Sequence, residues 1–309
     1  MGMPEDAVDA INDVSGRHPG HRAAHAKGTL VSGSFTATPE GSRLTRAAHM
    51  RGEPVRATVR FSNGGGDPGR PDYAREGRGM AVKLYLPDGS RTDMVALSLP
   101  AFFVRTPEDF IEFTRLRKPD PETGKPDMQR MGPWLGDHPE AGPAIQASLA
   151  AEPPASYAQV AYNGIHAFRW TSADGEGRWV RFSWQPAAGE ATLDGGQARE
   201  LGADYLQTEI HERIGREPVA FRLVVRIAAE GDPLDDPTAI WPDDRETVEA
   251  GRLELTGQDS ERERGGDILV FDPTRVTDGI ELSEDPILNF RPRAYSVSIE
   301  RRAGASDRP

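Results

Sequence analysis

The sequence predicts an α+β fold in which most strands belong to an antiparallel sheet that is able to close into a barrel. Two turn signals indicate antiparallel pairing, because Pro87-Asp-Gly89 and Ala173-Asp-Gly175 each lie between two β-favouring runs. Helix signals are inserted between these hairpins. An antiparallel sheet needs closure or cover for its edges, and a barrel of about eight strands has an interior filled by side chains.

The chain is expected to begin with a helix followed by four strands. Ala7, Ile11 and Val14 have helical spacing after Pro4, so a short amphipathic helix is predicted over residues 4–14. Four β-favouring runs follow, at residues 29–37, 55–62, 79–86 and 91–98. The last two runs form the first predicted hairpin, because a glycine in their turn accepts a positive φ.

Helix signals dominate the next part of the chain. Thr106 suits an N-cap and Pro107 the first helical position, which predicts a helix over residues 106–115. Residues 117–138 are rich in proline, glycine and charge, so we predict a connector there. A further helix is expected at residues 139–151.

The second half of the chain combines strands with one clear helix. Residues 157–171 and 177–185 are predicted to form the second hairpin. Leu206, Ile210 and Ile214 mark one face of a helix. Three more strands are expected, at residues 221–227, 251–256 and 267–271.

Composition and charge exclude several classes of protein. The chain has 37 basic and 49 acidic residues, and its net charge of −12 argues against a partner such as nucleic acid or an anionic membrane. It has no cysteine, which excludes disulfides, thiolate metal ligands and cysteine catalysis. Residues 1–20 lack the features of a secretory signal, and no run approaches the ~18 apolar residues of a membrane span. We therefore expect a cytoplasmic protein.

The domain organisation is expected to be simple. The 309 residues suit one large or two small domains, and no stretch marks a boundary between two domains. We predict a single domain over residues 1–309, with an N-terminal helix or arm at residues 1–16 and a disordered tail at residues 303–309.

The end of the chain carries a tyrosine between two arginines. Arg291, Tyr295, Ser298 and Arg302 lie at i, i+4, i+7 and i+11, so a helix would place all four on one face. A phenol titrates near pH ~10 and becomes an anionic ligand at neutral pH only if a cation or a metal stabilises its charged form. Arg291 is able to supply that charge. Taken alone, the pattern also fits an exposed helix face.

Two earlier stretches combine a cation with a group suited to hydrogen bonding or proton transfer. Arg22 and His25 lie three residues apart in His21-Arg-Ala-Ala-His-Ala-Lys-Gly28. Arg60 and Ser62 end the apolar run Ala57-Thr-Val-Arg-Phe-Ser-Asn-Gly64. Each stretch alone is more often structural than functional.

Together these three stretches resemble the catalase family. In that family the pattern R-x-x-H-A-K-G carries the distal histidine, R-F-S carries a propionate-binding arginine and a distal serine, and R-x-x-x-Y carries the proximal tyrosine. The three patterns occur here in the same order. The resemblance implies an eight-stranded antiparallel β-barrel with flanking helices and a haem b cofactor.

Five further segments extend the resemblance over residues 17 to 302, about the whole chain. It is closest to the small catalase-related peroxidases, since the additions of full catalases have no room here. The matching segments begin at Asp72, Pro100, Asn163, Asp236 and Phe271.

On the proximal side of the haem, the resemblance assigns an iron ligand and its partners. Tyr295 matches the axial ligand of the haem iron, and Arg291 matches the residue that keeps it a phenolate. The other residues that match cofactor contacts are Arg22, Arg60, Phe103 and Arg302. The arginines would pair with the haem propionates.

On the distal side, the resemblance assigns His25 to general acid–base work. A neutral imidazole can take the proton of a peroxide and return it to the departing oxygen. Ser62 is placed to hydrogen-bond the other ring nitrogen and fix the tautomer. Ala24 and Gly64 replace valines of full catalases, so we expect a wider distal cavity.

One departure from the family pattern decides the expected activity. Full catalases carry an asparagine that donates to bound peroxide, and we align Ser98, in Ser98-Leu-Pro-Ala-Phe-Phe103, with that position. A shorter hydroxyl is expected to weaken the oxidation of a second peroxide. We therefore expect a haem peroxidase that reduces hydrogen peroxide or organic hydroperoxides with a small-molecule reductant, has weak catalase activity and is a monomer or homodimer.

Two alternatives remain open from the sequence. A hydroperoxide isomerase or dehydratase of the allene-oxide type uses the same scaffold without external electrons. A noncatalytic haem-binding barrel would not need His25. His166 is expected to make a structural hydrogen bond in a strand.

Overall fold

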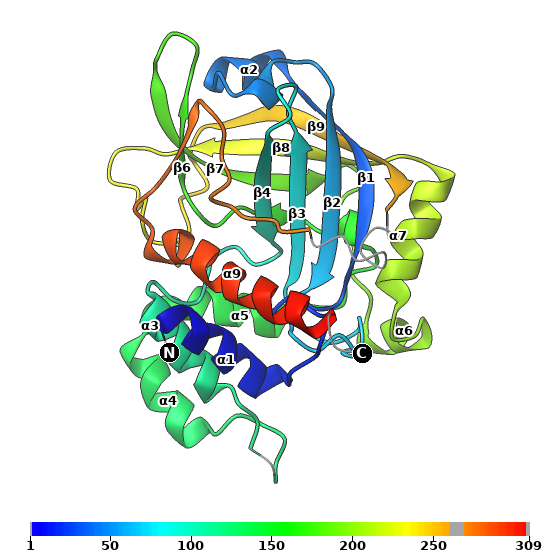
Figure 1. Cartoon of the computed structure of the whole chain (residues 1–309), viewed down its shortest axis with the longest axis vertical. Coiled ribbons are helices and arrows are strands. Elements are labelled where there is room, and N and C mark those ends of the chain that lie inside the picture. Colours follow the sequence, from blue (N-terminus) through cyan, green and yellow to red (C-terminus); the bar gives the residue numbers. More distant parts are fainter. Residues whose placement is uncertain (1, 121, 260–268, 307–309) are drawn as a thin grey trace.

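Eight strands form a closed antiparallel barrel at the centre of the molecule (Figure 1). The computed structural model describes residues 2–120, 122–259 and 269–306. The barrel strands are β1 (Gly28–Ala37), β2 (Val55–Asn63), β3 (Arg78–Tyr85), β4 (Arg91–Leu97), β5 (Tyr162–Asn163), β7 (Gly177–Pro186), β8 (Val219–Ile227) and β9 (Thr247–Gln258). Their order is β7-β5-β4-β3-β2-β1-β9-β8, and pairing of β8 with β7 closes the ring. The predicted eight-stranded barrel is confirmed.

Two short strands extend the sheet beyond the ring. β6 (Phe168–Thr171) pairs with β7, and β10 (Ile280–Leu282) pairs with β6. The turn between β3 and β4 contains Gly89 at φ +83°, and the turn between β6 and β7 contains Gly175 at φ +89°. Both glycines adopt the left-handed conformation that the two hairpin signals require.

The barrel interior is a packed aromatic core. Phe61 of β2 stacks on Tyr157 with ring centres 5.4 Å apart, and Phe35 of β1 meets Trp184 of β7 edge-on at 5.9 Å. All four side chains are buried. In β3 and β4, Met80, Val82, Met94 and Ala96 belong to this core. Since strand residues alternate between the two faces, the residues between them point outward. A functional cavity is therefore expected against the outer face of the barrel and not inside it.

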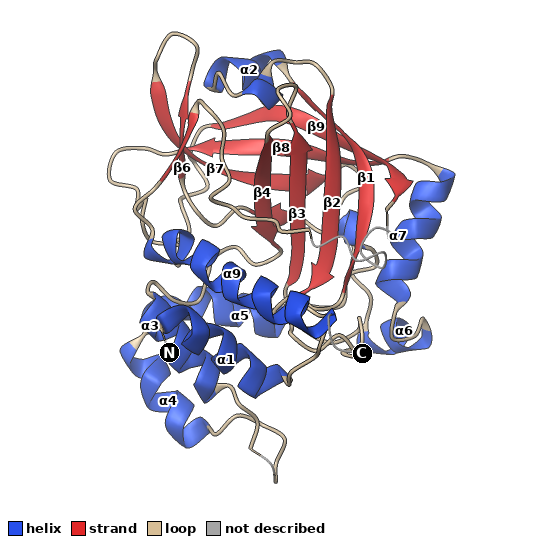
Figure 2. Cartoon of the chain, viewed as in Figure 1, coloured by secondary structure: helices blue, strands red, loops and turns tan. Residues whose placement is uncertain are grey.

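Helices cover one end of the barrel (Figure 2). The helices gathered there are α1 (Met3–Ser15), α3 (Pro107–Leu116), α4 (Met128–Asp137), α5 (Gly142–Ala150) and α9 (Pro286–Ser306). α9 crosses between the barrel and α1, and it contacts both α1 and α3. Among the described residues, no helix has the length and apolar character needed to cross a bilayer.

The remaining helices lie around the barrel wall. α2 (Pro39–Leu44) packs on β9, and α7 (Tyr205–Arg216), which follows α6 (Gly195–Glu200), lies against β9 and β1. Three short 3₁₀ helices complete the described part of the chain: η1 (Ala48–Met50), η2 (Pro139–Ala141) and η3 (Tyr157–Gln159).

Three predictions of local structure were wrong. The proposed connector contains α4, whose N-cap Asp127 accepts a hydrogen bond from the backbone N–H of Gln129. Residues 269–271 form no strand, and the other two residues of that predicted strand lie outside the described residues. α9 continues through Ser306, so the first residues of the predicted tail are helical, while residues 307–309 lie outside the described part.

His49 of η1 is a buried imidazole without a polar partner. Neither ring nitrogen has a hydrogen bond among the described residues, and the ring packs near Phe35 with ring centres 6.2 Å apart. Burial penalises the charged form and lowers the pKa of His49 to about 4.

Acid should therefore destabilise the protein partly through His49. As pH falls from 6.5 towards 4, the imidazole binds a proton in the unfolded protein but not in the folded one, so the free energy of unfolding decreases. Between neutral pH and pH 4 the wild type loses unfolding free energy. We expect this loss to be smaller by about 3 kcal/mol in His49→Leu. Urea unfolding at several pH values measures this. His21→Leu, at an exposed position, serves as the control. Parallel pH profiles for wild type and His49→Leu would contradict the expectation.

Candidate active site

A cavity lies between the outer face of the barrel and α9. Its walls come from α1, the loop before β1, strands β2 to β4, residues 269–271 and α9. Its volume is about 270 Å³, which is large enough to hold several water molecules or part of a bound ligand. Most of the lining is apolar. The polar lining residues are Arg22, His25, Arg60, Ser62, Arg291, Tyr295, Ser298 and Arg302.

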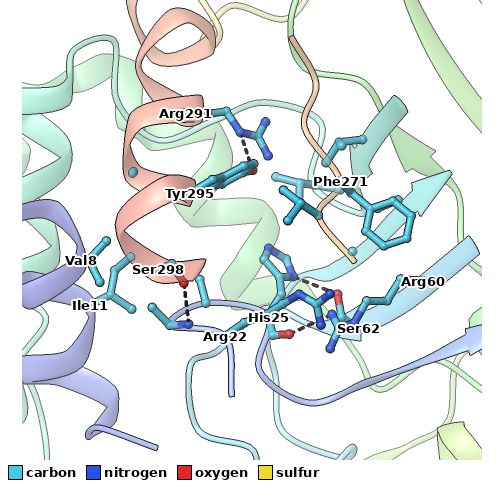
Figure 3. Close-up of a pocket in the computed structure, with 18 of the residues that line it drawn as sticks. Val8, Ile11, Arg22, His25, Arg60, Ser62, Phe271, Arg291, Tyr295 and Ser298 are labelled. Atoms are coloured by element: carbon cyan, nitrogen blue, oxygen red, sulfur yellow. Dashed lines mark hydrogen bonds between the residues drawn. The ribbon is translucent and has the colours of Figure 1, made fainter. Parts of the chain in front are cut away.

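Two predicted site residues point into this cavity from different elements. Figure 3 shows Tyr295 on α9 and His25 in the loop before β1 directed at the same space. The four residues of the predicted helix face, from Arg291 to Arg302, all line the cavity. The backbone N–H of Ala23 donates to Ser298 Oγ at 3.5 Å, which links the loop to α9.

A hydrogen-bonded chain supports Tyr295. Arg291 Nε donates to Tyr295 Oη at 2.8 Å, and Arg291 Nη1 donates to His166 Nε2 at 3.0 Å. Because a guanidinium only donates, Nε2 is the acceptor and the ring proton of His166 is on Nδ1. That nitrogen donates to Asp285 Oδ2 at 2.6 Å. Burial lowers the pKa of His166, which agrees with a neutral ring.

Asp285 also fixes the start of α9. Its Oδ1 accepts hydrogen bonds from the backbone N–H groups of Ile287 (2.8 Å) and Leu288 (3.1 Å). The carboxylate thus acts as an N-cap while its other oxygen binds His166. One buried residue sets both the position of the helix that carries Tyr295 and the orientation of Arg291's partner.

Backbone strain and close packing fix the position of His25. Among the residues that the structure describes, His25 is the one non-glycine residue with a positive φ, at +54°. Its carbonyl accepts from Arg60 Nη1 at 2.9 Å, and its Nδ1 lies 3.0 Å from Ser62 Oγ. A Cβ atom at position 79 would come within 2.8 Å of that nitrogen and 2.7 Å of the serine oxygen. Gly79 is therefore needed for this arrangement.

The electrostatic environment keeps His25 neutral. Its pKa is lowered to about 4, first by burial and then by the positive charges of Arg60, Arg291 and Arg22. At neutral pH the imidazole is a free base, with one nitrogen occupied by Ser62. Such a group can accept a proton from a molecule in the cavity.

Four arginines contribute to the lining of the cavity. Arg22, Arg60, Arg291 and Arg302 line it, and none of the lining residues that the structure describes is acidic. Arg22 Nη2 donates to the carbonyl oxygen of Leu269 at 2.8 Å, which fixes its orientation. A flat apolar molecule with anionic groups on its edge matches this lining.

Two predicted site residues do not line the cavity. Ser98 Oγ accepts a hydrogen bond from the backbone N–H of Arg78 at 2.8 Å, and the preceding residue, Leu97, lines the cavity instead. Adjacent residues at the end of a strand face opposite sides, so the alignment that selected Ser98 was displaced by one residue. Phe103 packs against Phe113 with ring centres 4.9 Å apart and is absent from the lining.

The neighbouring positions show the same pattern. Phe102 and Phe110 supply the aromatic wall expected of Phe103. Ala24 lines the cavity, whereas Gly64 does not; a Cβ there would lie 2.9 Å from the carbonyl oxygen of Gly77. Of the two positions expected to widen the distal cavity, only Ala24 therefore lies in its wall.

Sequence reasoning also missed parts of the site. The period-2 pattern of β4 could have identified Leu97, because that residue alternates with the inward-facing Met94 and Ala96. No local signal points to Asp285, whose histidine partner is 119 positions away. The same holds for α1, which contributes Ala7, Val8 and Ile11 to the wall.

Comparisons with known proteins agree with this geometry. The family model for catalase matches residues 7–307. The chain belongs to the catalase family. Catalase-family proteins generally bind haem, a flat molecule with two carboxylates on one edge, and the cavity lining suits such a group.

The similarity to individual catalase-family members covers nearly the full chain. The chain is 45% identical over 302 residues to a catalase-related peroxidase of Mycolicibacterium paratuberculosis, and the match covers 97% of this chain and 95% of the relative. A catalase-related peroxidase of Synechococcus elongatus is 35% identical over 300 residues, with 97% and 88% covered. The crystal structure of a fungal catalase superposes with a TM-score of 0.81 at 26% identity, covering 93% of this chain and 60% of that one.

Proposed function

We propose that this chain is a haem b-dependent peroxidase that reduces hydrogen peroxide and organic hydroperoxides with an external electron donor. One observation carries the proposal: a neutral His25 and an arginine-bound Tyr295 line one cavity from different walls. The two relatives named catalase-related peroxidase support the same class of reaction.

The lining residues suit both the iron and the carboxylates of haem b. Tyr295 would hold the iron, and Arg22, Arg60 and Arg302 would hold the two carboxylates. Bound haem would supply the redox chemistry that cleaves a peroxide bond. The guanidinium of Arg291 donates to the phenol oxygen at 2.8 Å and would hold that oxygen in position as the iron ligand.

His25 would move the proton of the peroxide. With Nδ1 donating to Ser62 Oγ, Nε2 is the nitrogen that can accept the proton of a peroxide in the cavity. It would then return this proton to the oxygen that departs as water or alcohol. The left-handed backbone and Gly79 hold the ring in place, so little reorganisation is needed during the transfer.

The distal wall favours reduction over oxidation of peroxide. Leu97 places an apolar side chain where an amide donor would be needed to orient a second peroxide. The same wall, with Ala24, Phe102 and Ile11, accepts the alkyl part of an organic hydroperoxide. Conversion of a fatty-acid hydroperoxide without any donor would instead indicate an isomerase.

Replacement of the proposed iron ligand tests the function directly. We expect Tyr295→Phe to remove the absorption bands of phenolate-bound ferric haem and to lower peroxide-driven donor oxidation by at least about 10²-fold. Tyr85→Phe removes a phenol hydroxyl that lies near Thr58, outside the cavity, and should leave both unchanged. Unaltered spectra and turnover in Tyr295→Phe would refute the proposal.

The pH profile should reflect the lowered pKa of His25. Because the neutral base persists below pH 6.5, kcat/KM for peroxide should stay level through that value and fall only near pH 4. Steady-state rates in buffers of constant ionic strength measure the profile. A fall centred at the ordinary histidine value would show that His25 is not the base.

Leu97 should limit oxygen production. Wild type should evolve oxygen from hydrogen peroxide alone more slowly than it oxidises a donor when one is added. Leu97→Asn should raise oxygen evolution on the order of tenfold, the effect expected of one buried hydrogen bond. Ser98→Ala should leave the ratio of the two activities unchanged, because the Ser98 hydroxyl is bound to the Arg78 backbone. Oxygen evolution by wild type that exceeds donor oxidation would contradict this expectation.

A further inference from the structure

A second pocket lies against the wall of the cofactor cavity. It is formed by the β3–β4 hairpin and the segment leading to Arg275, and its volume of about 450 Å³ is typical of a small-molecule site. Leu269 and Val270 line this pocket and the cofactor cavity alike. A molecule in the second pocket is therefore separated from the cofactor cavity by a single segment of chain.

The second pocket is cationic in a chain of strongly negative net charge. Lys83, Arg91 and Arg275 line it, and no acidic side chain is found among its described lining residues. Gly89 and Ser90 complete the hairpin side of the lining, and the N–H and hydroxyl of Ser90 donate to Asp88 Oδ1 at 2.9 and 2.6 Å. Such a concentration of positive charge attracts anions.

One buried carboxylate behind the pocket fixes two of these cations. Asp93 pairs with Lys83 Nζ, and its other oxygen lies 2.6 Å from Arg275 Nη1. Arg275 Nη1 also donates to the carbonyl oxygen of Val270 at 3.0 Å. Arg91 is exposed, and its guanidinium carbon lies 5.6 Å from the ring centre of Tyr85. Two carboxylates, Asp93 behind the pocket and Asp88 bound to Ser90, therefore lie beside the three positive charges of the lining.

We propose that this pocket binds the electron donor of the peroxidase reaction, a phenol that carries a carboxylate. The inference rests on the proposed function. The guanidinium groups of Arg91 and Arg275 suit the paired oxygens of a carboxylate, and the phenol would lie towards the wall shared with the cofactor cavity. Two phenols each give one electron and one proton, and the hydroperoxide gains both pairs to form one alcohol and one water.

Binding alone tests the site without any turnover. The haem-loaded protein is titrated calorimetrically with 4-methoxycinnamate, which has the carboxylate but no oxidisable hydroxyl, and with its methyl ester. We expect the acid to bind more tightly than the ester, and Arg91→Gln to raise the Kd of the acid about fivefold. Arg56→Gln is the matched control, since Arg56 lies over the same Tyr85 ring at 4.2 Å but does not line the pocket.

Turnover then tests the role as donor site. With ferulate and methyl ferulate as donors, the preference in kcat/KM for the acid should fall about fivefold in Arg91→Gln and keep its wild-type value in Arg56→Gln. Equal binding of acid and ester, or an unchanged Kd in Arg91→Gln, would overturn the site. Binding that depends on Arg91 without oxidation of either donor would overturn the donor role and the proposed function, while the anion site stands.

Discussion

The hydrogen bond from Arg291 to Tyr295 is the interaction on which the rest of the site depends. It joins two residues one helical turn apart, so the helix itself brings the cation to the phenol. The direction of the guanidinium is then set from outside the helix by His166 and, behind it, by Asp285. The series of hydrogen bonds from the Asp285 carboxylate to the Tyr295 phenol therefore connects His166, in the segment between β5 and β6, to α9.

The positive charges around the cavity have two physical effects. They suit a ligand with anionic edges, and they also lower the pKa of His25, together with burial. The same arginines therefore favour cofactor carboxylates and a neutral base. Arg60 links the two effects directly, because its guanidinium donates to the backbone carbonyls of His25 and Ala26 while it lines the cavity.

Local sequence patterns identified the parts of the fold that depend on local physics. The spacing from Arg291 to Arg302 predicted a helix face that does line the cavity, and the hairpin turns predicted two strand pairs that the sheet contains. The patterns failed where long-range packing decides. Ser98 and Leu97 could be separated only by knowing which strand face meets α9, and the pairing of His166 with Asp285 joins residues 119 positions apart.

The wall supplied by α1 has a consequence for assembly in the cell. Val8 and Ile11 of α1 lie beside α9, and Asp9 pairs with Arg301 at 2.8 Å across 292 positions of sequence. A ribosome releases the earlier helix long before it makes the later one. The cavity between them is complete only once α9 has been made, so a ligand that needs both walls would bind after α9 is translated.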